Sequence, residues 1–399
     1  MIKKLTHTFL IFLISIPSFA QLTPEVTSWI LTDGSVGYAS IPSNVQQVQY
    51  SANYVYVSAT CIPGYDIGPW PSNPNVPSNQ NFVFKITRNP VQNTGTLTAV
   101  GLGHVGVWSN GVSIYNSKDG MTYNNAGVWN RNALYYEGIS FDSCLGHAAQ
   151  NGEYHHHVNP KCLYDDTDSL NHSPIIGYAF DGFPIYGAYG YTNTNGTGAI
   201  KRMKSSYVLS PATTRASGPA VDATYPAGCF VEDYVYTAGT GDLDVHNGRY
   251  CITPDYPSGI YAYFVTLNDT LYPTFPFVLG STYYGTVGSG NTGPGSGHNT
   301  ITESVTTYTV TGISAKSDIQ FACFPNPVNS DLSIFVASNQ GNNLTATILN
   351  TLGEVVMKQE YIQPSVSYDF NLSQLSPGIY YLTLENETAR SVQKIMVAR

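Results

Sequence analysis

Short runs of alternating apolar and polar residues recur along most of the chain. Tyr54–Ser58 alternates aromatic with β-branched and small residues, and Phe82–Ile86 places three large apolar side chains on one face of an extended segment. Turns rich in glycine, proline, asparagine and serine separate these runs, and no segment shows a convincing helical period. The pattern predicts an all-β protein built from many short strands.

Two of the runs resemble each other. Ser109–Asn116 reads SNGVSIYN, and Phe180–Gly187 reads FDGFPIYG. Asn-Gly and Asp-Gly favour tight hairpins because both central residues of a type I′ turn need positive φ. An internal duplication would produce this likeness, and so would two hairpins built by the same turn chemistry. One short match does not separate these explanations, and we favour the second.

The strand pattern changes near Thr311–Asp318. The 399-residue chain is long enough for two domains, and we place a large β domain at residues 21–312, a linker at 313–321 and a terminal unit at 322–399. The terminal unit contains strand-like runs separated by turns, among them Phe324–Val336 and Leu375–Glu385. Such a series predicts a small Ig-like β-sandwich.

The N-terminus has the pattern of a secretory signal peptide. Lys3 and Lys4 precede the apolar run Phe9–Ile14, and small residues follow at Ser18 and Ala20. We therefore expect residues 1–20 to be removed on export, and no later segment is apolar for long enough to span a bilayer. The chain has 17 basic and 26 acidic residues and lacks Lys/Arg clusters that could hold a phosphate backbone, which argues against a nucleic-acid partner.

Export favours disulfides among the six cysteines. Two local disulfides are the economical expectation, because two pairs lie close in the sequence: Cys144 with Cys162, and Cys229 with Cys251. Cys61 and Cys323 are left, and a bond between them would tie distant parts of the chain together. Six cysteines allow 15 pairings, and spacing alone does not choose among them.

The terminal unit also resembles the C-terminal sorting domain of the type IX secretion system, found in bacteria of the Bacteroidetes group. The resemblance covers Phe324–Arg399 and rests on Pro325-Asn326-Pro327, Gly353, Gly378-Ile379-Tyr380 and the ending at Lys394-Ile395. It implies that the type IX machinery is a partner and that the protein is released or attached at the cell surface. An unrelated Ig-like binding module is the alternative, and the terminal position behind a signal peptide argues against it.

The large domain, residues 21–312, resembles the YHYH domain family, which is named for a Tyr-His-Tyr-His motif. Three segments carry the resemblance in order: Phe141–Pro160, His172–Gly187 and Asp242–Thr266. One position departs from the motif, because His156 stands where the name expects tyrosine. The resemblance supplies no established activity, so function has to be argued from the residues.

The first of these segments contains the run Glu153–Asn159, EYHHHVN. Alternate residues of a strand share a face, so His155 and His157 lie on a wholly polar face and His156 lies on a packing face. Two imidazoles at i and i+2 suit one metal ion, and metal sites with an open position commonly have three protein ligands. His147 is the nearest candidate for the third.

The connection before this strand decides whether His147 can join the pair. A strict two-residue turn at Asn151-Gly152 would place His147 opposite His156, on the packing face. A bulge or a longer loop through Ala148–Gly152 would return it to the polar face. The metal hypothesis therefore depends on the geometry of one turn.

Three aspartates, Asp142, Asp181 and Asp244, are candidates to hold the imidazole N–H groups. Each also has an ordinary structural role, which we rank first: Asp181 opens an Asp-Gly turn, Asp142 caps a strand end, and Asp244 pairs with Arg249. Among metals, three imidazoles suit zinc or copper far better than magnesium.

The expected function is that of a secreted or cell-surface protein that binds copper or zinc through His147, His155 and His157. The metal would activate water or an oxygen species against an extracellular small molecule or polymer, but no general base is identifiable, so catalysis stays open. Two alternatives remain. The histidines belong to a hydrogen-bonded network that rigidifies the core, or a tyrosine-rich surface of a non-catalytic module contacts glycans or other polymers. The motifs of serine hydrolases, P-loop nucleotide hydrolases and HExxH proteases are absent.

Overall fold

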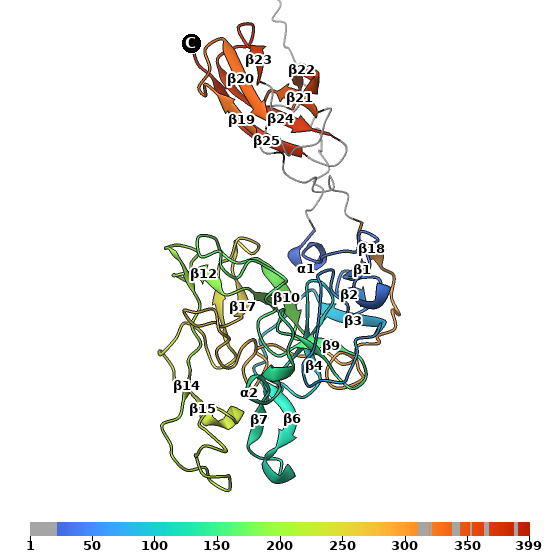
Figure 1. Cartoon of the computed structure of the whole chain (residues 1–399), viewed down its shortest axis with the longest axis vertical. Helices are drawn as coiled ribbons and strands as arrows, with labels where there is room; N and C mark the ends of the chain where they lie inside the picture. Colours follow the sequence, from blue (N-terminus) through green and yellow to red (C-terminus); the bar gives the residue numbers. More distant parts are fainter. Residues whose placement is uncertain are drawn as a thin grey trace, which may run out of the picture. The chain divides into compact units, whose positions relative to one another are not determined.

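The computed structural model describes residues 22–309, residue 319 and residues 321–399 apart from 337–343, 352, 363–366 and 387–389. The predicted signal peptide and most of the predicted linker lie outside the described residues. The chain divides into two compact units, Met1–Tyr308 and Thr309–Arg399 (Figure 1). Among the described residues, no helix combines the length and the apolar character that a membrane span needs.

The first unit contains an eight-stranded sheet of order β16-β17-β11-β10-β4-β5-β9-β8. Neighbouring strands pair antiparallel, except that β5 pairs parallel with β9 and β11 pairs parallel with β17. The strands are β4 (His104–Trp108), β5 (Ser113–Tyr115), β8 (His147–Ala148), β9 (Tyr154–His156), β10 (Ile175–Ala179), β11 (Pro184–Tyr186), β16 (Gly248–Cys251) and β17 (Ile260–Phe264).

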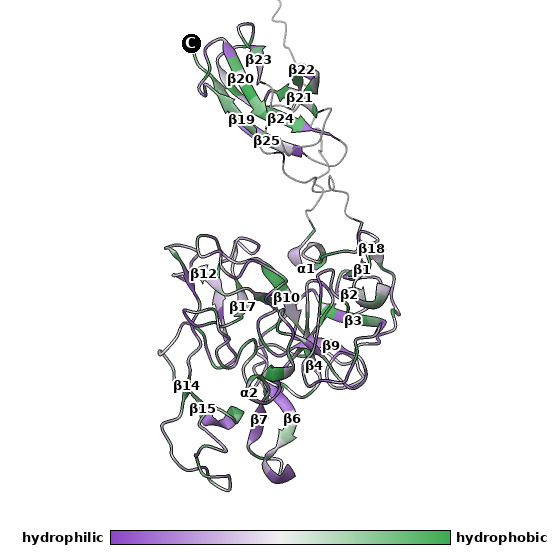
Figure 2. Ribbon diagram, viewed as in Figure 1, coloured by the Kyte–Doolittle hydropathy of each residue, from purple (hydrophilic) through white to green (hydrophobic). Residues whose placement is uncertain are grey.

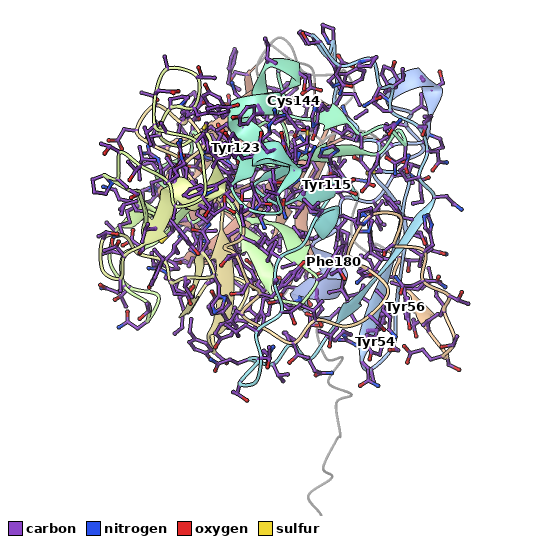
Figure 3. The ribbon with its side chains drawn as sticks, turned by 90° about the horizontal axis from the view of Figure 1, so that it is seen from below. Tyr54, Tyr56, Tyr115, Tyr123, Cys144 and Phe180 are labelled. Atoms are coloured by element: carbon purple, nitrogen blue, oxygen red, sulfur yellow. A yellow bond between two sulfur atoms is a disulfide. The ribbon has the colours of Figure 1, made fainter. Side chains whose placement is uncertain are left out.

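A four-stranded sheet of order β18-β1-β2-β3 packs against the larger one. Its strands are β1 (Val45–Tyr50), β2 (Tyr54–Ala59), β3 (Phe82–Thr87) and β18 (Thr306–Thr307). Phe84 of β3 is buried in one apolar cluster with Val107 and Tyr178 of the larger sheet. Tyr54 and Tyr56, two residues apart in β2, lie close to each other (Figure 3). The alternating runs of the sequence thus form β2 and β3, as predicted.

Smaller elements decorate these sheets. The two-stranded pairs are β6 (Lys118–Thr122) with β7 (Asn130–Asn132), β12 (Tyr189–Tyr191) with β13 (Ile200–Arg202), and β14 (Tyr207–Leu209) with β15 (Tyr234–Tyr236). The helices are α1 (Pro24–Thr27) and α2 (Ala133–Glu137), with short 3-10 turns η1 (Tyr38–Ser40), η2 (Tyr123–Asn125), η3 (Gly138–Ser140) and η4 (Val231–Asp233). Helix α2 follows β7 (Figure 1), begins at an Asn132 cap that accepts from the Leu134 N–H, and continues into η3.

The eight-stranded sheet has an internal two-fold pattern. The first half comprises β4, β5, β8 and β9, and the second half comprises β10, β11, β16 and β17. The hairpins β4–β5 and β10–β11 share one register and one irregularity. In the first hairpin, His104 pairs with Tyr115 and Gly106 pairs with Ile114. In the second, Ile175 pairs with Tyr186 and Gly177 pairs with Ile185. Strand β4 pairs with β10 at the centre. The likeness of the two sequence segments is therefore a likeness of whole hairpins.

The match continues into the flanking strands. In each half, the backbone N–H of an aspartate donates to the carbonyl of a glycine four residues later. The N–H of that glycine donates back to the aspartate carboxylate. The hydroxyl of a tyrosine in the next strand donates to the same carboxylate. The residues are Asp142, Gly146 and Tyr154 in the first half, and Asp244, Gly248 and Tyr261 in the second. Turn chemistry alone does not require this agreement. The structure therefore favours an internal duplication over two independent hairpins, which the sequence had favoured.

The second unit is a small β-sandwich, in agreement with the predicted Ig-like tail. Its two sheets have the orders β19-β20-β23 and β22-β21-β24-β25, and their buried side chains form one apolar cluster. Figure 2 shows hydrophobic residues along β20 and β24. The strands are β19 (Phe321–Phe324), β20 (Asp331–Val336), β21 (Leu344–Leu349), β22 (Val355–Ile362), β23 (Ser367–Asn371), β24 (Gly378–Glu385) and β25 (Arg390–Val397).

One of the two expected local disulfides forms. Cys144 and Cys162 are bonded, whereas Cys229 and Cys251 are free and buried. The sulfur of Cys229 lies 3.8 Å from a guanidinium nitrogen of Arg215, while Cys251 ends β16 in a separate apolar cluster. The prediction of a Cys229–Cys251 bond is wrong, because the chain between them leads the two thiols into different surroundings. Cys61 and Cys323 are also free, so the bond expected between them is not observed.

Candidate metal centre

A three-residue turn brings His147 to the polar face of β9. The Ala149 N–H donates to the Glu153 carbonyl, and the Gly152 N–H donates to the Ala149 carbonyl. The connection is therefore one residue longer than a strict Asn-Gly turn, and Gly152 adopts a φ of 82°, which glycine tolerates without strain. This length pairs His147 with His155. The longer-loop alternative is the one the structure shows.

The three imidazoles named by the sequence converge. Nε2 of His155 lies 3.1 Å from Nε2 of His147 and 3.1 Å from Nε2 of His157. All three residues are at most 5% exposed, and their ligand atoms lie within 4.8 Å of one another. In a tetrahedral site with metal–nitrogen bonds of about 2.0–2.1 Å, two ligand nitrogens stand about 3.3 Å apart. The observed spacing fits a single ion.

Two of the rings are held by backbone carbonyls. Nδ1 of His155 lies 3.0 Å from the Glu153 carbonyl oxygen, and Nδ1 of His157 lies 2.5 Å from that of Asn116. A carbonyl oxygen only accepts hydrogen bonds, so both Nδ1 atoms must carry the proton. In the neutral rings, both Nε2 atoms then present a lone pair.

The third ring has the same tautomer for a different reason. Nδ1 of His147 lies 2.8 Å from the Ser140 hydroxyl oxygen. That hydroxyl donates its own proton to the Glu137 carbonyl, so it accepts from the imidazole N–H. All three Nε2 lone pairs therefore point into one space, where they cannot hydrogen-bond to one another.

Glu137, the last residue of α2, adds a carboxylate to the same space. Its Oε2 lies 3.0 Å from Nε2 of His157 and 3.8 Å from Nε2 of His147. This oxygen is buried and has no hydrogen-bond donor among the described protein atoms. A buried carboxylate oxygen facing three lone pairs is costly unless a cation lies between them.

Burial also favours the neutral imidazoles. It lowers the pKa of His147 to about 4, with the neighbouring His157 as a further cause, and it lowers the pKa of His155 well below its usual range. Both effects disfavour the charged ring. A neutral imidazole is the form that binds a metal ion.

A buried network fixes the ring plane of His155. The Tyr115 ring stacks on it, with centroids 3.8 Å apart, and the Tyr115 hydroxyl donates to Glu153 Oε2 at 3.0 Å. The other carboxylate oxygen of Glu153 lies 2.9 Å from Nδ1 of His104. Glu153 therefore positions His155 twice, through its carbonyl and through Tyr115.

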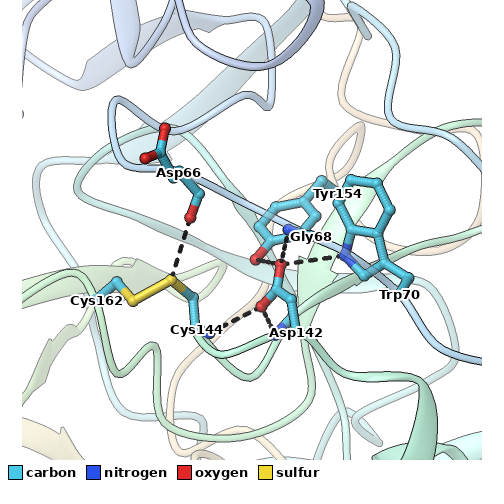
Figure 4. The surroundings of a disulfide bond; sticks show 8 residues. Asp66, Gly68, Trp70, Asp142, Cys144, Tyr154 and Cys162 are labelled. Carbon is cyan, nitrogen blue, oxygen red and sulfur yellow. Dashed lines mark hydrogen bonds between the residues drawn. A yellow bond between two sulfur atoms is a disulfide. The ribbon is translucent and has the colours of Figure 1, made fainter.

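The three aspartates do not hold the imidazoles. Asp142 accepts from the Tyr154 hydroxyl, from the Trp70 indole and from three backbone N–H groups beside the Cys144–Cys162 bond (Figure 4). Asp181 accepts from Tyr263, and Asp244 from Tyr261 and backbone N–H groups, not from Arg249. Of the structural roles ranked first from the sequence, the Asp-Gly turn at Asp181 forms, with the Gly182 N–H donating to the Ala179 carbonyl and the Phe183 N–H to the Asp181 carboxylate. The partner expected for Asp244 is wrong.

The residues that hold the imidazole N–H groups in place of the aspartates were not predicted from the sequence. Ser140 and Asn116 act through one hydroxyl and one carbonyl, which leave no pattern in a sequence. Glu137 left only a weak signal, as the single acidic residue in the segment between Asp119 and Asp142.

The centre opens into a cavity of about 670 Å³. The three histidines and Glu137 lie on its wall together with Tyr115, Tyr136, Lys118 and Asp119. Ile139 also lines the cavity and is 73% exposed. The cavity is within the range of about 300–1000 Å³ that is usual for small-molecule sites.

The second half of the sheet shows what these positions look like without histidine. His147 pairs with His155 across β8 and β9, and the equivalent pair across β16 and β17 is Arg249 with Ala262. Two residues beyond Ala262, Phe264 corresponds to His157. The same backbone arrangement therefore forms with no histidine at any of the three positions.

Comparison with known families matches two parts of the chain. The model described as YHYH protein matches residues 83–277, and the model described as Secretion system C-terminal sorting domain matches residues 322–398. No curated protein matches the chain significantly. The first match contains the three histidines and Glu137, and the second covers the small β-sandwich. The chain carries a YHYH domain followed by a C-terminal sorting domain of the type IX secretion system, which directs it to the cell surface or outside.

Proposed function

We propose that the YHYH domain is a transition-metal site that works at the cell surface or outside, and that it holds zinc or copper through His147, His155 and His157. The observation that carries the proposal is the convergence of three Nε2 lone pairs and the Glu137 carboxylate on one buried space. Only a cation satisfies all four groups at once.

The second half of the sheet supports this function over a purely structural role. A hydrogen-bonded network that rigidifies the core would be needed wherever the fold recurs. Arg249, Ala262 and Phe264 occupy the equivalent positions, so the fold itself does not demand histidines. Their presence in one half only favours a chemical purpose.

The surroundings suit metal-dependent chemistry on an extracellular substrate. The three ligands leave room for a further ligand on the cavity side, where a metal ion would polarise water or an oxygen species. Glu137 stands where a fourth ligand or a base for bound water would stand.

Elemental analysis of the purified full chain tests the proposal. We expect about one zinc or copper ion per chain, and none in the double variant His155→Ala/His157→Phe, which introduces the residues of the second half and should stay folded by circular dichroism. His298→Ala, at an exposed histidine outside the cluster, should keep the ion. A folded wild-type chain that takes up neither metal would overturn the proposal, as would a double variant that binds as much as wild type.

A further inference from the structure

A second cavity of the first unit is lined by aromatic rings. It has a volume of about 610 Å³ and lies between α2, the β14–β15 pair and the segment 267–277. The Tyr234 and Phe275 rings stack with centroids 4.3 Å apart, and Tyr207 meets Phe275 edge-on at 5.4 Å. Tyr135 and Tyr272 are 51% and 57% exposed. We call this cavity, with its lining, the aromatic cleft.

A tight turn fixes one of the two exposed tyrosines. The Asn268 side chain accepts from the N–H groups of Thr270 and Tyr272, and the Asn268 N–H donates to the Tyr272 carbonyl. Pro273 follows directly. The Tyr272 ring is therefore presented by a pre-organised loop, so little ordering entropy is lost when a ligand covers it.

Basic side chains line one wall of the aromatic cleft. Arg202 pairs with the exposed Asp269 at 2.7 Å, and its Nε is buried without a hydrogen-bond partner among the described residues. The exposed Lys204 ammonium makes no ion pair in the described part of the chain. Two cations against one anion give this wall a net positive charge in a chain whose formal charge is -9.

A second hollow of about 580 Å³ adjoins the cleft. The two hollows share Arg202, Lys204 and Asp269, and the second adds Lys201, which pairs with Asp242, and the buried Tyr189. Three cations against two anions keep the combined lining positive, and two adjoining hollows suit a chain-like ligand better than a compact molecule.

We propose that the aromatic cleft binds an acidic oligosaccharide, a chain of sugars that carry carboxylates. The flat tyrosine faces would stack on the apolar faces of sugar rings, and their hydroxyls would meet the sugar hydroxyls. Arg202 and Lys204 would contact the carboxylates, as charged donors do in other anion sites. This site is separate from the metal centre and does not depend on a bound ion.

Titration calorimetry on the full chain tests the proposal with two probes, a hexamer of galacturonic acid and the neutral cellohexaose. We expect the acidic hexamer to bind and Tyr135→Ala/Tyr272→Ala to weaken it by about tenfold or more, since exposed aromatic anchors carry much of such binding energy. Lys204→Ala should weaken the acidic hexamer and leave the neutral one unchanged. Tyr250→Ala, at an exposed tyrosine outside the cleft, should change nothing.

Other results would overturn the site. These are no binding of either hexamer, equal affinity for both, or undiminished binding by a folded double tyrosine variant. The metal-centre variant His155→Ala/His157→Phe should bind the acidic hexamer as wild type does. Failure at the cleft and failure at the metal centre are therefore distinguished.

Discussion

At the scale of single residues, the tautomers of three histidines decide what their cluster can do. Each Nδ1 proton is committed to an acceptor, two backbone carbonyls and the Ser140 hydroxyl. In a purely structural cluster, an N–H of one imidazole would donate a hydrogen bond to the ring nitrogen of the next. Here no N–H faces another ring, so the arrangement of the three Nε2 atoms is favourable only around a positive charge.

Glu137→Gln tests the contribution of the carboxylate. The amide keeps the shape of the side chain but removes its negative charge, so we expect zinc affinity to fall by about 10–100-fold, the range typical when a metal-site partner is lost. Competition with a chromophoric chelator measures this. Asp119→Asn, at a carboxylate of the same cavity that pairs with Arg131 instead, is the control, and equal losses in both variants would contradict a specific role for Glu137.

The two halves of the sheet predict matched energetic effects. Tyr154→Phe and Tyr261→Phe each remove one buried hydroxyl that donates to an aspartate, Asp142 or Asp244. Each carboxylate keeps other donors, so we expect each change to cost about 1–2 kcal/mol of unfolding free energy. Denaturant titration checks this. Costs that differ by several kcal/mol would show that the two halves are not equivalent.

Alternation predicted that His155 and His157 lie together, because a period of two places both on one face, and His147 was the nearest further histidine. The groups that surround these histidines could not be predicted from the sequence. Asn116 contributes a carbonyl that every residue has, and Glu137 reaches the centre only because α2 ends there. The wrong cysteine pair has the same origin, since closeness in sequence does not report the path of a loop.

At the scale of elements, the length of one turn determines which histidines lie together. With three residues in the loop, His147 faces His155; with two, it would face His156. The sequence could state this choice but not make it, because Asn151-Gly152 is also the preferred two-residue turn and only the packed structure shows Gly152 ending a three-residue loop.

Insertion of one alanine between Ala149 and Gln150 tests the turn. With the three-residue loop Gln150–Gly152 unchanged, the inserted residue would pair with Glu153, so the edge strand β8 should shift by one position and place His147 opposite His156, while β9 stays paired with β5. We expect a folded protein without stoichiometric zinc in elemental analysis. Gln150→Ala keeps the length of the connection and should keep the ion. Zinc retained after the insertion would mean that the length of this connection does not set the register.

At the scale of the whole molecule, the fold class and the tail were predictable and the duplication was not. Many short alternating runs allow little besides an all-β fold, and the tail carries family-specific spacing. The two-fold relation lies in strand pairings such as Ile114 with His156 and Ile185 with Tyr263. The isoleucines match in the sequence but their partners, His156 and Tyr263, do not, so the structure is needed to show that the pairings are equivalent.

Removal of the tail tests the independence of the two units. A chain ending at Tyr308 keeps β18, which pairs with β1, and loses only the sorting domain. We expect it to bind the same amount of metal and to melt within a few degrees of the full chain, because the first unit has its own apolar core. Loss of metal on truncation would show that the tail supports the centre.

Helix α2 touches both proposed sites. Leu134 and Tyr135 line the aromatic cleft, and Tyr136 and Glu137 line the metal cavity. One short helix therefore contributes side chains to both cavities. Any linkage between the two sites has to be reciprocal: a factor by which a bound sugar chain changed the affinity for zinc would also be the factor by which zinc changed the affinity for the sugar. Equal binding of the acidic hexamer by wild type and by His155→Ala/His157→Phe means that this factor is one, so the exported protein would hold its polymer with or without its metal.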